Sequence, residues 1–331
     1  ASGTIPSWKI QKAVALALES STVVELLDPS LLAKDKLISL TEAITKIHLP
    51  QRDSDFLAAR KSLKYHEALL LQLALLQSRA AKETDAALVL GESQLALQFD
   101  KQLDFDYTEG QQQVISEIAG DLSAGHPMHR LLQGEVGSGK TVVALRTVLH
   151  AASEGHQSAL LAPTEVLAEQ HYNSTINTLG PDLTRQLGVR LLKGSLSGPE
   201  RKRAMLDIAS GKCLLAIGTH ALIAEKVSFA DLGLVIIDEQ HRFGVGQREL
   251  LRAKAKQPPH VLTMTATPIP RTVAITTFGD LDISTLTELP AGRQEIETFV
   301  VPVGQPALVS RVWARVSEEL TAGRQAFVVC P

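Results

Sequence analysis

The sequence predicts an α/β fold in which a mainly parallel β-sheet follows a helical region. Three observations support this prediction. From Phe105 onward, short apolar segments typical of strands alternate with segments of helical periodicity. A glycine-rich loop at residues 134–141 stands between one such strand and the helix that follows it. Residues 1 to about 100 show helical periodicity throughout, so the sheet is expected only after them.

The composition is that of a soluble globular protein. The chain has 331 residues, 44% of them hydrophobic, and a formal net charge of -3. This charge gives no general sign of nucleic-acid binding, which would have to rest on local placement of side chains. Cys213 and Cys330 form no C-x-x-C pair and indicate neither a disulfide framework nor a zinc site. No apolar run reaches about 18 residues and no signal peptide opens the chain, so we expect a soluble protein of the reducing cytoplasm.

The helical region is expected to hold no catalytic cluster. Ser7 is a suitable cap for a first helix, and Ser39 with Glu42 forms the pattern of a capping box before a short second one. A longer helix is predicted over residues 55–81. Its leucine-rich part, residues 68–76, indicates burial on more than one face.

Two further features of this region bear on function. The basic side chains of Arg60, Lys61 and Lys64 are interpreted as a solvated face, with contact to DNA as the open alternative. Residues 82–101 are less periodic and are predicted to be a flexible connector.

Six strands are predicted after the helical region, with helices between them, for example over residues 165–179 and 200–210. The strands are expected at residues 129–132, 158–162, 189–192, 214–218, 234–237 and 261–265. In parallel sheets of this kind, ligand chemistry lies at the carboxyl ends of the strands. The candidate motifs follow these ends.

The first motif fits G-x-x-x-x-G-K-[ST], a loop whose backbone N–H groups surround nucleotide phosphates. The predicted strand before it and helix after it are the context that this loop requires. Lys140 is expected to reach the β- and γ-phosphates, and the Thr141 hydroxyl to bind Mg²⁺. The residues assigned to nucleotide binding are Gly134, Glu135, Val136, Gly137, Ser138, Gly139, Lys140 and Thr141.

The second motif is the apolar strand that ends in Asp238 and Glu239. In a protein with the glycine loop, the first carboxylate holds Mg²⁺ and the second orients and deprotonates the attacking water. Gln240 and His241 follow directly, beside the expected γ-phosphate. A histidine at a strand end is more often structural, so this pair is less specific than the two acids.

Polar groups follow other strands as well. Thr265 and Thr267 lie at the end of the last predicted strand. They are interpreted either as part of a simple turn or as hydroxyl groups that link the acidic pair to whatever the protein moves. Upstream, Phe105, Thr108 and Gln111 precede the first strand, and a glutamine amide can both donate to and accept from adenine. Two more segments combine helix N-caps with donors for a nucleic-acid backbone: Pro163, Thr164 and Glu165, and Thr219 and His220.

The ordered set of these motifs resembles the first, RecA-like motor lobe of superfamily 2 helicases. The longer phrases at residues 128–134, 238–245, 264–272 and 278–284 are similar to those of the RecG family of bacterial ATP-dependent DNA helicases. The resemblance covers most of residues 105–331 and extends more loosely into the helical region. It departs from the family pattern at Glu135, where aspartate is usual, and at Asp104, where proline is common.

The resemblance implies an ATP hydrolase that moves on DNA and remodels stalled forks, branched DNA and Holliday junctions in recombination and repair. It implies ATP and Mg²⁺ as cofactors, a monomer, and single-strand DNA-binding protein as a further partner. By resemblance Gln111 and Phe105 bind adenine, and Lys140, Asp238, Glu239, Gln240 and His241 form the catalytic set. Pro163, Thr164, Glu165, Thr219, His220, Thr265 and Thr267 contact DNA or couple the two sites.

The expected organisation is a helical region at residues 1–103, an ATP-binding lobe at residues 104–292 and the beginning of a second lobe at residues 293–331. Strands are expected at residues 295–301 and 325–329. We expect a part of a longer protein, because the family's wedge domain and its arginine finger have no counterpart here, so the chain alone should hydrolyse ATP slowly. Two alternatives stay open: a transcription-repair coupling translocase, and a nucleotide-gated module that binds DNA or protein without translocation.

Overall fold

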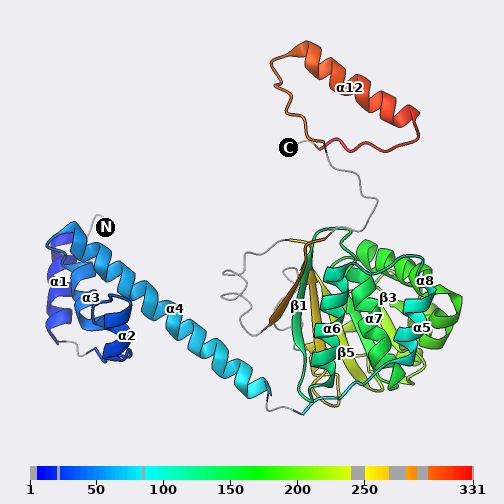
Figure 1. The fold of residues 1–331 in the computed structure, drawn as a ribbon, viewed down its shortest axis with the longest axis horizontal. Coiled ribbons are helices and arrows are strands. Elements are labelled where there is room, and N and C mark those ends of the chain that lie inside the picture. The colour runs from blue at the N-terminus through cyan, green and yellow to red at the C-terminus, as the bar shows by residue number, and fades with distance from the viewer. Residues whose placement is uncertain are drawn as a thin grey trace. The chain divides into compact units, whose positions relative to one another are not determined.

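The chain folds into two compact units, residues 1–290 and 291–331. The structure, a computed structural model, describes residues 6–20, 23–83, 86–239, 250–267, 281–288 and 297–329. The first unit contains four N-terminal helices followed by an α/β lobe (Figure 1). In the described part of the chain, no helix combines the length and apolar character needed to span a membrane.

The N-terminal helices are α1 (Ser7–Ser20), α2 (Pro29–Lys34), α3 (Leu40–His48) and α4 (Asp53–Glu83). Their order confirms the predicted helical region. Ser39 caps α3 by accepting a hydrogen bond from the Glu42 N–H at 3.2 Å. The Glu42 carboxylate lies 2.7 Å from Lys46 Nζ instead of closing the expected capping box.

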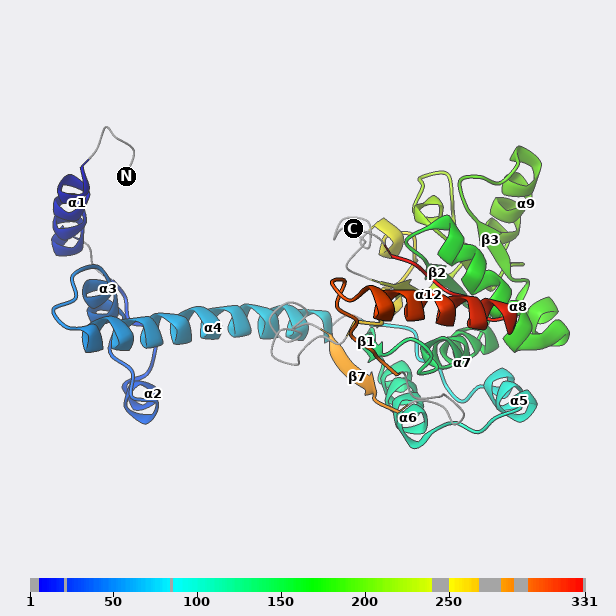
Figure 2. The ribbon, with the colours of Figure 1, turned by 90° about the horizontal axis from the view of Figure 1, so that it is seen from above.

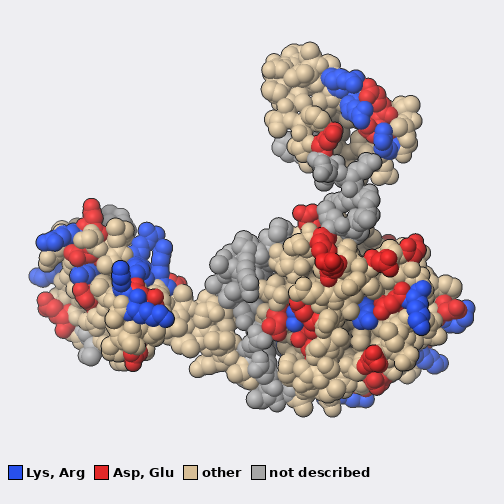
Figure 3. Space-filling model, viewed as in Figure 1, with Lys and Arg blue, Asp and Glu red and all other residues tan. Residues whose placement is uncertain are grey.

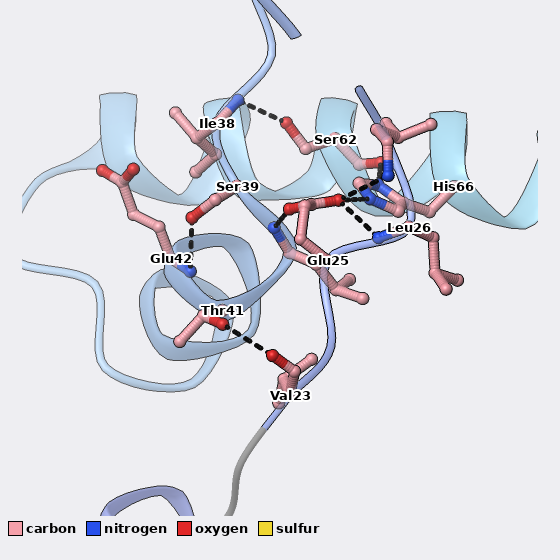
Figure 4. Close-up of polar contacts among 11 residues, drawn as sticks. Val23, Glu25, Leu26, Ile38, Ser39, Thr41, Glu42, Ser62 and His66 are labelled. Atoms are coloured by element: carbon pink, nitrogen blue, oxygen red, sulfur yellow. Dashed lines mark hydrogen bonds and ion pairs between the residues drawn. The ribbon is translucent and has the colours of Figure 1, made fainter. Parts of the chain in front are cut away.

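A polar cluster joins three of these segments (Figure 4). The Glu25 carboxylate accepts hydrogen bonds from the backbone N–H groups of Leu27 at 3.0 Å and Leu40 at 2.6 Å, and lies 3.0 Å from His66 Nε2. The other ring nitrogen of His66 lies 2.8 Å from the Ser62 carbonyl oxygen. These contacts, the His66 hydrogen bond first, lower the pKa of Glu25 to about 2. The cluster therefore ties the segment before α2 and the start of α3 to α4.

The leucine-rich part of α4 differs from the prediction. None of residues 68–76 is buried, and Leu70, Leu73 and Leu76 are 50%, 46% and 57% exposed. A helix of 9 residues such as α3 spans about 14 Å, whereas the 31 residues of α4 span about 46 Å. Burial of these leucines on more than one face is thus wrong for this structure, because α3 is too short to cover them.

The connector predicted at residues 82–101 is also wrong in its described part. Residues 94–102 form α5 (Gln94–Gln102), in which Phe99 is fully buried. Before it, the Leu90 N–H donates to Leu122 O at 2.9 Å, and the Ser93 hydroxyl donates to Leu149 O at 2.9 Å. The sequence did not reveal α5 because nine residues are too few to show a clear hydrophobic periodicity. The residues that pack against this segment are also far away in the sequence.

Within the described residues the sheet contains seven strands, all paired in parallel, in the order β3-β4-β2-β5-β6-β1-β7. The six predicted strands are confirmed, and β7 is an additional strand at one edge. The strands are β1 (His129–Gly134), β2 (Gln157–Leu161), β3 (Arg190–Leu192), β4 (Leu215–Gly218), β5 (Leu232–Asp238), β6 (His260–Thr265) and β7 (Asp282–Leu286).

Two hydrophobic cores cover the two faces of the sheet. Successive residues of a strand point to opposite faces, so Leu160 and Leu234 belong to one core and Leu161 and Val235 to the other. The first core is completed by α5 and by α6 (Glu109–Ser123), α7 (Lys140–Ser153) and α8 (Glu165–Leu187), which lie over one face (Figure 1). The second contains α9 (Gly198–Ala209), which lies beside β3 (Figure 2), and the 3-10 helix η1 (His220–Leu222).

The second unit contains α12 (Pro306–Thr321), none of whose residues is buried. The described residues of the two strands expected there, 297–301 and 325–329, are not in strands. This prediction is wrong for the structure, since a strand exists only where a neighbour takes up its backbone hydrogen bonds.

Candidate nucleotide-binding site

The topology brings the predicted motifs to one edge of the sheet. Because parallel strands end at the same edge, residues that follow adjacent strands become neighbours. Along the order β4-β2-β5-β6-β1, this edge presents Thr219, Thr164, Asp238, Thr265 and Gly134. A hydrogen bond joins the ends of two of these strands: the Ala162 N–H, just after β2, donates to the carbonyl oxygen of Gly218, the last residue of β4, at 2.8 Å.

The glycine-rich loop joins β1 to α7, and two of its glycines cannot be replaced without a clash. A Cβ atom on Gly134 would lie 2.6 Å from Ser138 Oγ and 3.1 Å from Leu286 O. Gly139 has a φ of +86°, and a Cβ there would lie 2.2 Å from Gln111 Nε2. Because these two positions have no side chain, the loop backbone can approach a phosphate closely at the start of α7.

Lys140, the first residue of α7, holds this loop together. Its Nζ donates to the carbonyl oxygens of Gly134 at 2.6 Å and Glu135 at 2.8 Å. Burial lowers the pKa of Lys140, while the charges of Asp238 and Glu239 act in the opposite direction. The ammonium thus lies at the loop beside two carboxylates, where it can exchange carbonyl oxygens for phosphate oxygens.

A cavity of about 640 Å³ opens between the loop, α8 and the ends of β5 and β6. This volume is within the range of small-molecule sites, roughly 300–1,000 Å³. The cavity collects Lys140, Thr141, Asp238 and Glu239, which the sequence places almost a hundred residues apart. Its remaining lining residues are Val136, Gly137, Gly139, Leu167, Gln170, His171, Ser174, Met264, Ala266 and Thr267.

One face of α8 lines this cavity and was not part of the predicted site. Its members are Leu167, Gln170, His171 and Ser174, and His171 Nε2 lies 2.8 Å from Asp238 Oδ2. Spacings of three and four residues place these side chains on one face of a helix. That spacing in the predicted helix was the available signal, but nothing in the sequence says which face turns toward the cavity.

Glu239 is held by the end of β6. Its φ is +51°, which is uncommon for a residue with a side chain, and its N–H donates to Met264 O at 3.0 Å. The carboxylate accepts from the Ala266 N–H at 3.2 Å and from the Thr265 hydroxyl at 3.5 Å. Thr265 and Thr267 lie 2.9 Å apart at their hydroxyl oxygens. Thr265 therefore contacts the second acid directly, and Thr267 is connected to it through Thr265.

Gln111 is brought to the loop, whereas Phe105 is not among the lining residues of the cavity. The Gln111 amide is buried, donates to Ser138 O at 2.9 Å and accepts from the Thr108 N–H at 3.1 Å, which closes a capping box at the start of α6. Phe105 is 46% exposed.

The remaining candidates occupy the helix starts after β2 and β4. Pro163 precedes Thr164, which caps α8, and Thr219 caps η1, where His220 is exposed. The Glu165 carboxylate accepts from the hydroxyl of a serine after β3, which lowers the pKa of Glu165. Gln240 and His241 lie outside the described residues.

The donors present fit a magnesium nucleotide. Thr141 and Asp238 offer oxygen atoms to the same cavity, and Mg²⁺ is usually held by one or two such groups together with phosphate oxygens. No group of three or more His, Cys, Asp or Glu residues that could hold a metal occurs among the described residues. The Ser138 hydroxyl is buried and has no hydrogen-bond partner among them, so the loop has polar capacity left for a ligand.

The family profile of the DEAD/DEAH box helicases matches residues 108–276, just over half of the chain. This chain belongs to that family. The match runs through the glycine loop, the acidic pair and the threonines at the end of β6.

Individual relatives are more specific. The chain is 47% identical over 345 aligned positions to the "ATP-dependent DNA helicase RecG" of Mycobacterium tuberculosis, covering all of this chain and 47% of the relative. The protein of that name from Bacillus subtilis is 43% identical over 298 positions, which are 89% of this chain and 43% of the relative. A solved RecG bound to a three-way DNA junction superposes with a TM-score of 0.79 and 37% identity, over 99% of this chain and 44% of that one. The chain thus spans less than half the length of these relatives and is similar to them throughout its own length.

Proposed function

We propose that the chain is the ATP-binding part of a RecG-type ATP-dependent DNA helicase, which uses ATP hydrolysis to remodel stalled forks and branched DNA, Holliday junctions included. The observation that carries the proposal is the meeting of Lys140, Thr141, Asp238 and Glu239 in one cavity. The similarity to RecG along the whole chain supports the choice of helicase class. We propose the boundaries 1–103, 104–292 and 293–331 for its helical region, first lobe and second-lobe beginning.

Each side chain has a separate role in the proposed reaction. Lys140 moves from the loop carbonyls to the phosphates, and Glu239 orients the attacking water and accepts its proton. Thr141 and Asp238 would hold Mg²⁺, which when bound offsets the charge on the β- and γ-phosphates. Thr265 contacts Glu239, and Thr267 contacts Thr265; the two threonines are proposed to link the position of Glu239 to the DNA side of the lobe.

DNA is proposed to lie along the starts of α8 and η1. Over the lobe in Figure 3, acidic and basic side chains are interspersed, in keeping with the net charge of -3. Among the described residues, the face of the lobe drawn there carries no broad basic surface. Thr164, which is exposed at the start of α8, instead offers its hydroxyl to a backbone phosphate. Thr219 is buried and caps η1, where the exposed His220 is the side chain that DNA could reach. We also propose that the protein is a monomer, acts in the cytoplasm and binds single-strand DNA-binding protein.

Replacing the loop lysine tests the proposed site. Lys140→Ala should reduce ATP affinity at least 100-fold in calorimetry, because the principal phosphate charge is lost. Lys254→Ala is the matched control, since Lys254 Nζ also donates to two backbone carbonyls, those of Ala224 and Val227, but outside the cavity. Its nucleotide affinity should stay at the wild-type value.

Unchanged affinity in Lys140→Ala would refute the nucleotide site. The helicase class has its own test: ATP turnover of the longer protein should rise with branched DNA, and this rise should vanish in Lys140→Ala. A nucleotide-gated module would bind ATP without that rise.

A further inference from the structure

We infer that His171 is the positioning residue of Asp238: it fixes the carboxylate that would hold Mg²⁺. This inference rests on the proposed function, because it concerns the same nucleotide site. His171 comes from α8 and lies outside all the sequence motifs that identify the site.

The contact is short and lies in the wall of the cavity. His171 Nε2 lies 2.8 Å from Asp238 Oδ2, and the two side chains are only 14% and 15% exposed. An ionised carboxylate can only accept hydrogen bonds, so Nε2 carries the hydrogen in this pair. The second oxygen, Oδ1, is thereby left for the metal.

The helix that carries His171 is itself fixed. Thr164 caps its first turn with a hydrogen bond to the Leu167 N–H at 3.2 Å. Ala168 and Thr175, on either side of His171, are fully buried. Lys193 at the end of β3 pairs with Glu169. His171 therefore has little freedom to follow a moving carboxylate, and it holds Asp238 in one orientation.

A hydrogen bond to a metal-binding carboxylate affects metal binding by setting the orientation of its oxygens. Loss of such a supporting contact typically lowers metal affinity about 10–100-fold. The effect should appear only when the metal is present, since His171 in this role does not touch the nucleotide. This dependence separates a positioning residue from a nucleotide-binding one.

The test is a calorimetric titration of ATP into the 331-residue chain at a series of Mg²⁺ concentrations. In His171→Ala, the Mg²⁺ concentration that gives half-maximal tightening of ATP binding should rise about tenfold or more. His171→Gln, whose Nε2–H can take the same place, should recover most of the loss. ATP affinity measured with EDTA should be unchanged in both variants.

The matched control is His156→Ala, which also removes a histidine–aspartate pair. His156 Nδ1 lies 2.9 Å from Asp231 Oδ2, before β2 and β5 and outside the cavity. Its Mg²⁺ dependence should equal that of the wild type. In an Asp238→Ala background, His171→Ala should cause no further change, because the carboxylate that it positions is gone.

Two results would overturn the inference. One is an identical Mg²⁺ dependence in wild type, His171→Ala and His171→Gln. The other is a loss of ATP affinity of equal size with Mg²⁺ and with EDTA, which would make His171 a nucleotide contact. A failure of the proposed function would look different, because the wild type itself would then not bind ATP.

Discussion

The Glu25 carboxylate accepts four hydrogen bonds, from the backbone N–H groups of Leu26, Leu27 and Leu40 and from His66 (Figure 4). Those from His66, Leu40 and Leu27, in this order, favour its ionised form and lower its pKa from 4.5 to about 2. Protonation would weaken them together. One side chain thus controls how three segments of the helical region meet.

Stability of the helical region should therefore depend on Glu25 at acid pH. A depressed carboxyl pKa contributes stability above pH 4.5, which is lost as the pH falls from 4.5 toward 2. We expect Glu25→Gln to lower the unfolding temperature at pH 7. Below pH 4.5, the unfolding temperature of this variant should fall less with decreasing pH than that of the wild type. Thermal unfolding followed by circular dichroism measures both effects. Glu67→Gln, at an exposed position of α4, is the control and should follow the wild-type profile.

At the residue scale, sequence motifs predicted which four residues would meet in the cavity. Lys140 and Thr141 belong to a contiguous motif, and Asp238 and Glu239 end a strongly apolar strand. His171 could not be identified in this way, because its role depends on which face of α8 meets the end of β5. That choice is made by packing across the sheet, which no local pattern records.

At the scale of elements, the end of β4 depends on a single glycine. A Cβ atom on Gly218 would lie 2.2 Å from Leu192 O, in the backbone of the neighbouring strand β3. Backbone cannot move aside as a flexible side chain can. β4 can therefore pair with β3 at this point only if the residue has no side chain.

Gly218→Ala should lower the free energy of unfolding by roughly 3 kcal/mol, because the strands must separate to admit the methyl group. Gly120→Ala is the counterpart inside α6, where a Cβ would meet nothing within 4 Å. It should raise stability by about 0.5–1 kcal/mol through its better helix propensity. Urea unfolding of both variants gives the comparison, and equal effects would contradict it.

The elements that could be predicted are those with a strong apolar signal. β2, β5 and β6 are almost completely buried, and their apolar runs make them easy to recognise. β7 has the sequence Asp-Ile-Ser-Thr-Leu, too polar for such a run. Part of its support comes from Arg130, which donates to Ser284 at 2.7 Å. Strand β7 is thus stabilised by a partner 154 residues away, which local sequence does not reveal.

At the scale of the whole molecule, His260 joins three distant segments at the amino end of the sheet. Its Nδ1 accepts from the Met128 N–H at 3.0 Å, and its Nε2 lies 2.8 Å from Leu88 O, to which it donates. The side chain is fully buried, and burial lowers its pKa. The neutral ring is therefore the form that fits the fold.

Acid should weaken the lobe through His260. Since the folded pKa is lower than the usual 6.5, its stabilisation is present above pH 6.5 and is lost as the pH falls below that value. His260→Gln should reduce the loss of unfolding temperature between pH 7.5 and 5.5. His48→Gln, at an exposed position of α3, should leave that loss unchanged. A wild-type unfolding temperature that is flat over this range would contradict the expectation.

The position of β1 in the sheet has a consequence for synthesis of the chain on the ribosome. Leu131 in β1 pairs with Thr263 in β6 and with Ile283 in β7, so both neighbours are made more than a hundred residues later. At 5–20 residues per second, β1 would wait about 7–26 s for its first neighbour. During that time both edges of a strand that is buried in the finished fold are open to wrong partners. The nucleotide loop is therefore synthesised well before the strands that flank β1. ATP can assist folding only after those strands have been made and the site has formed.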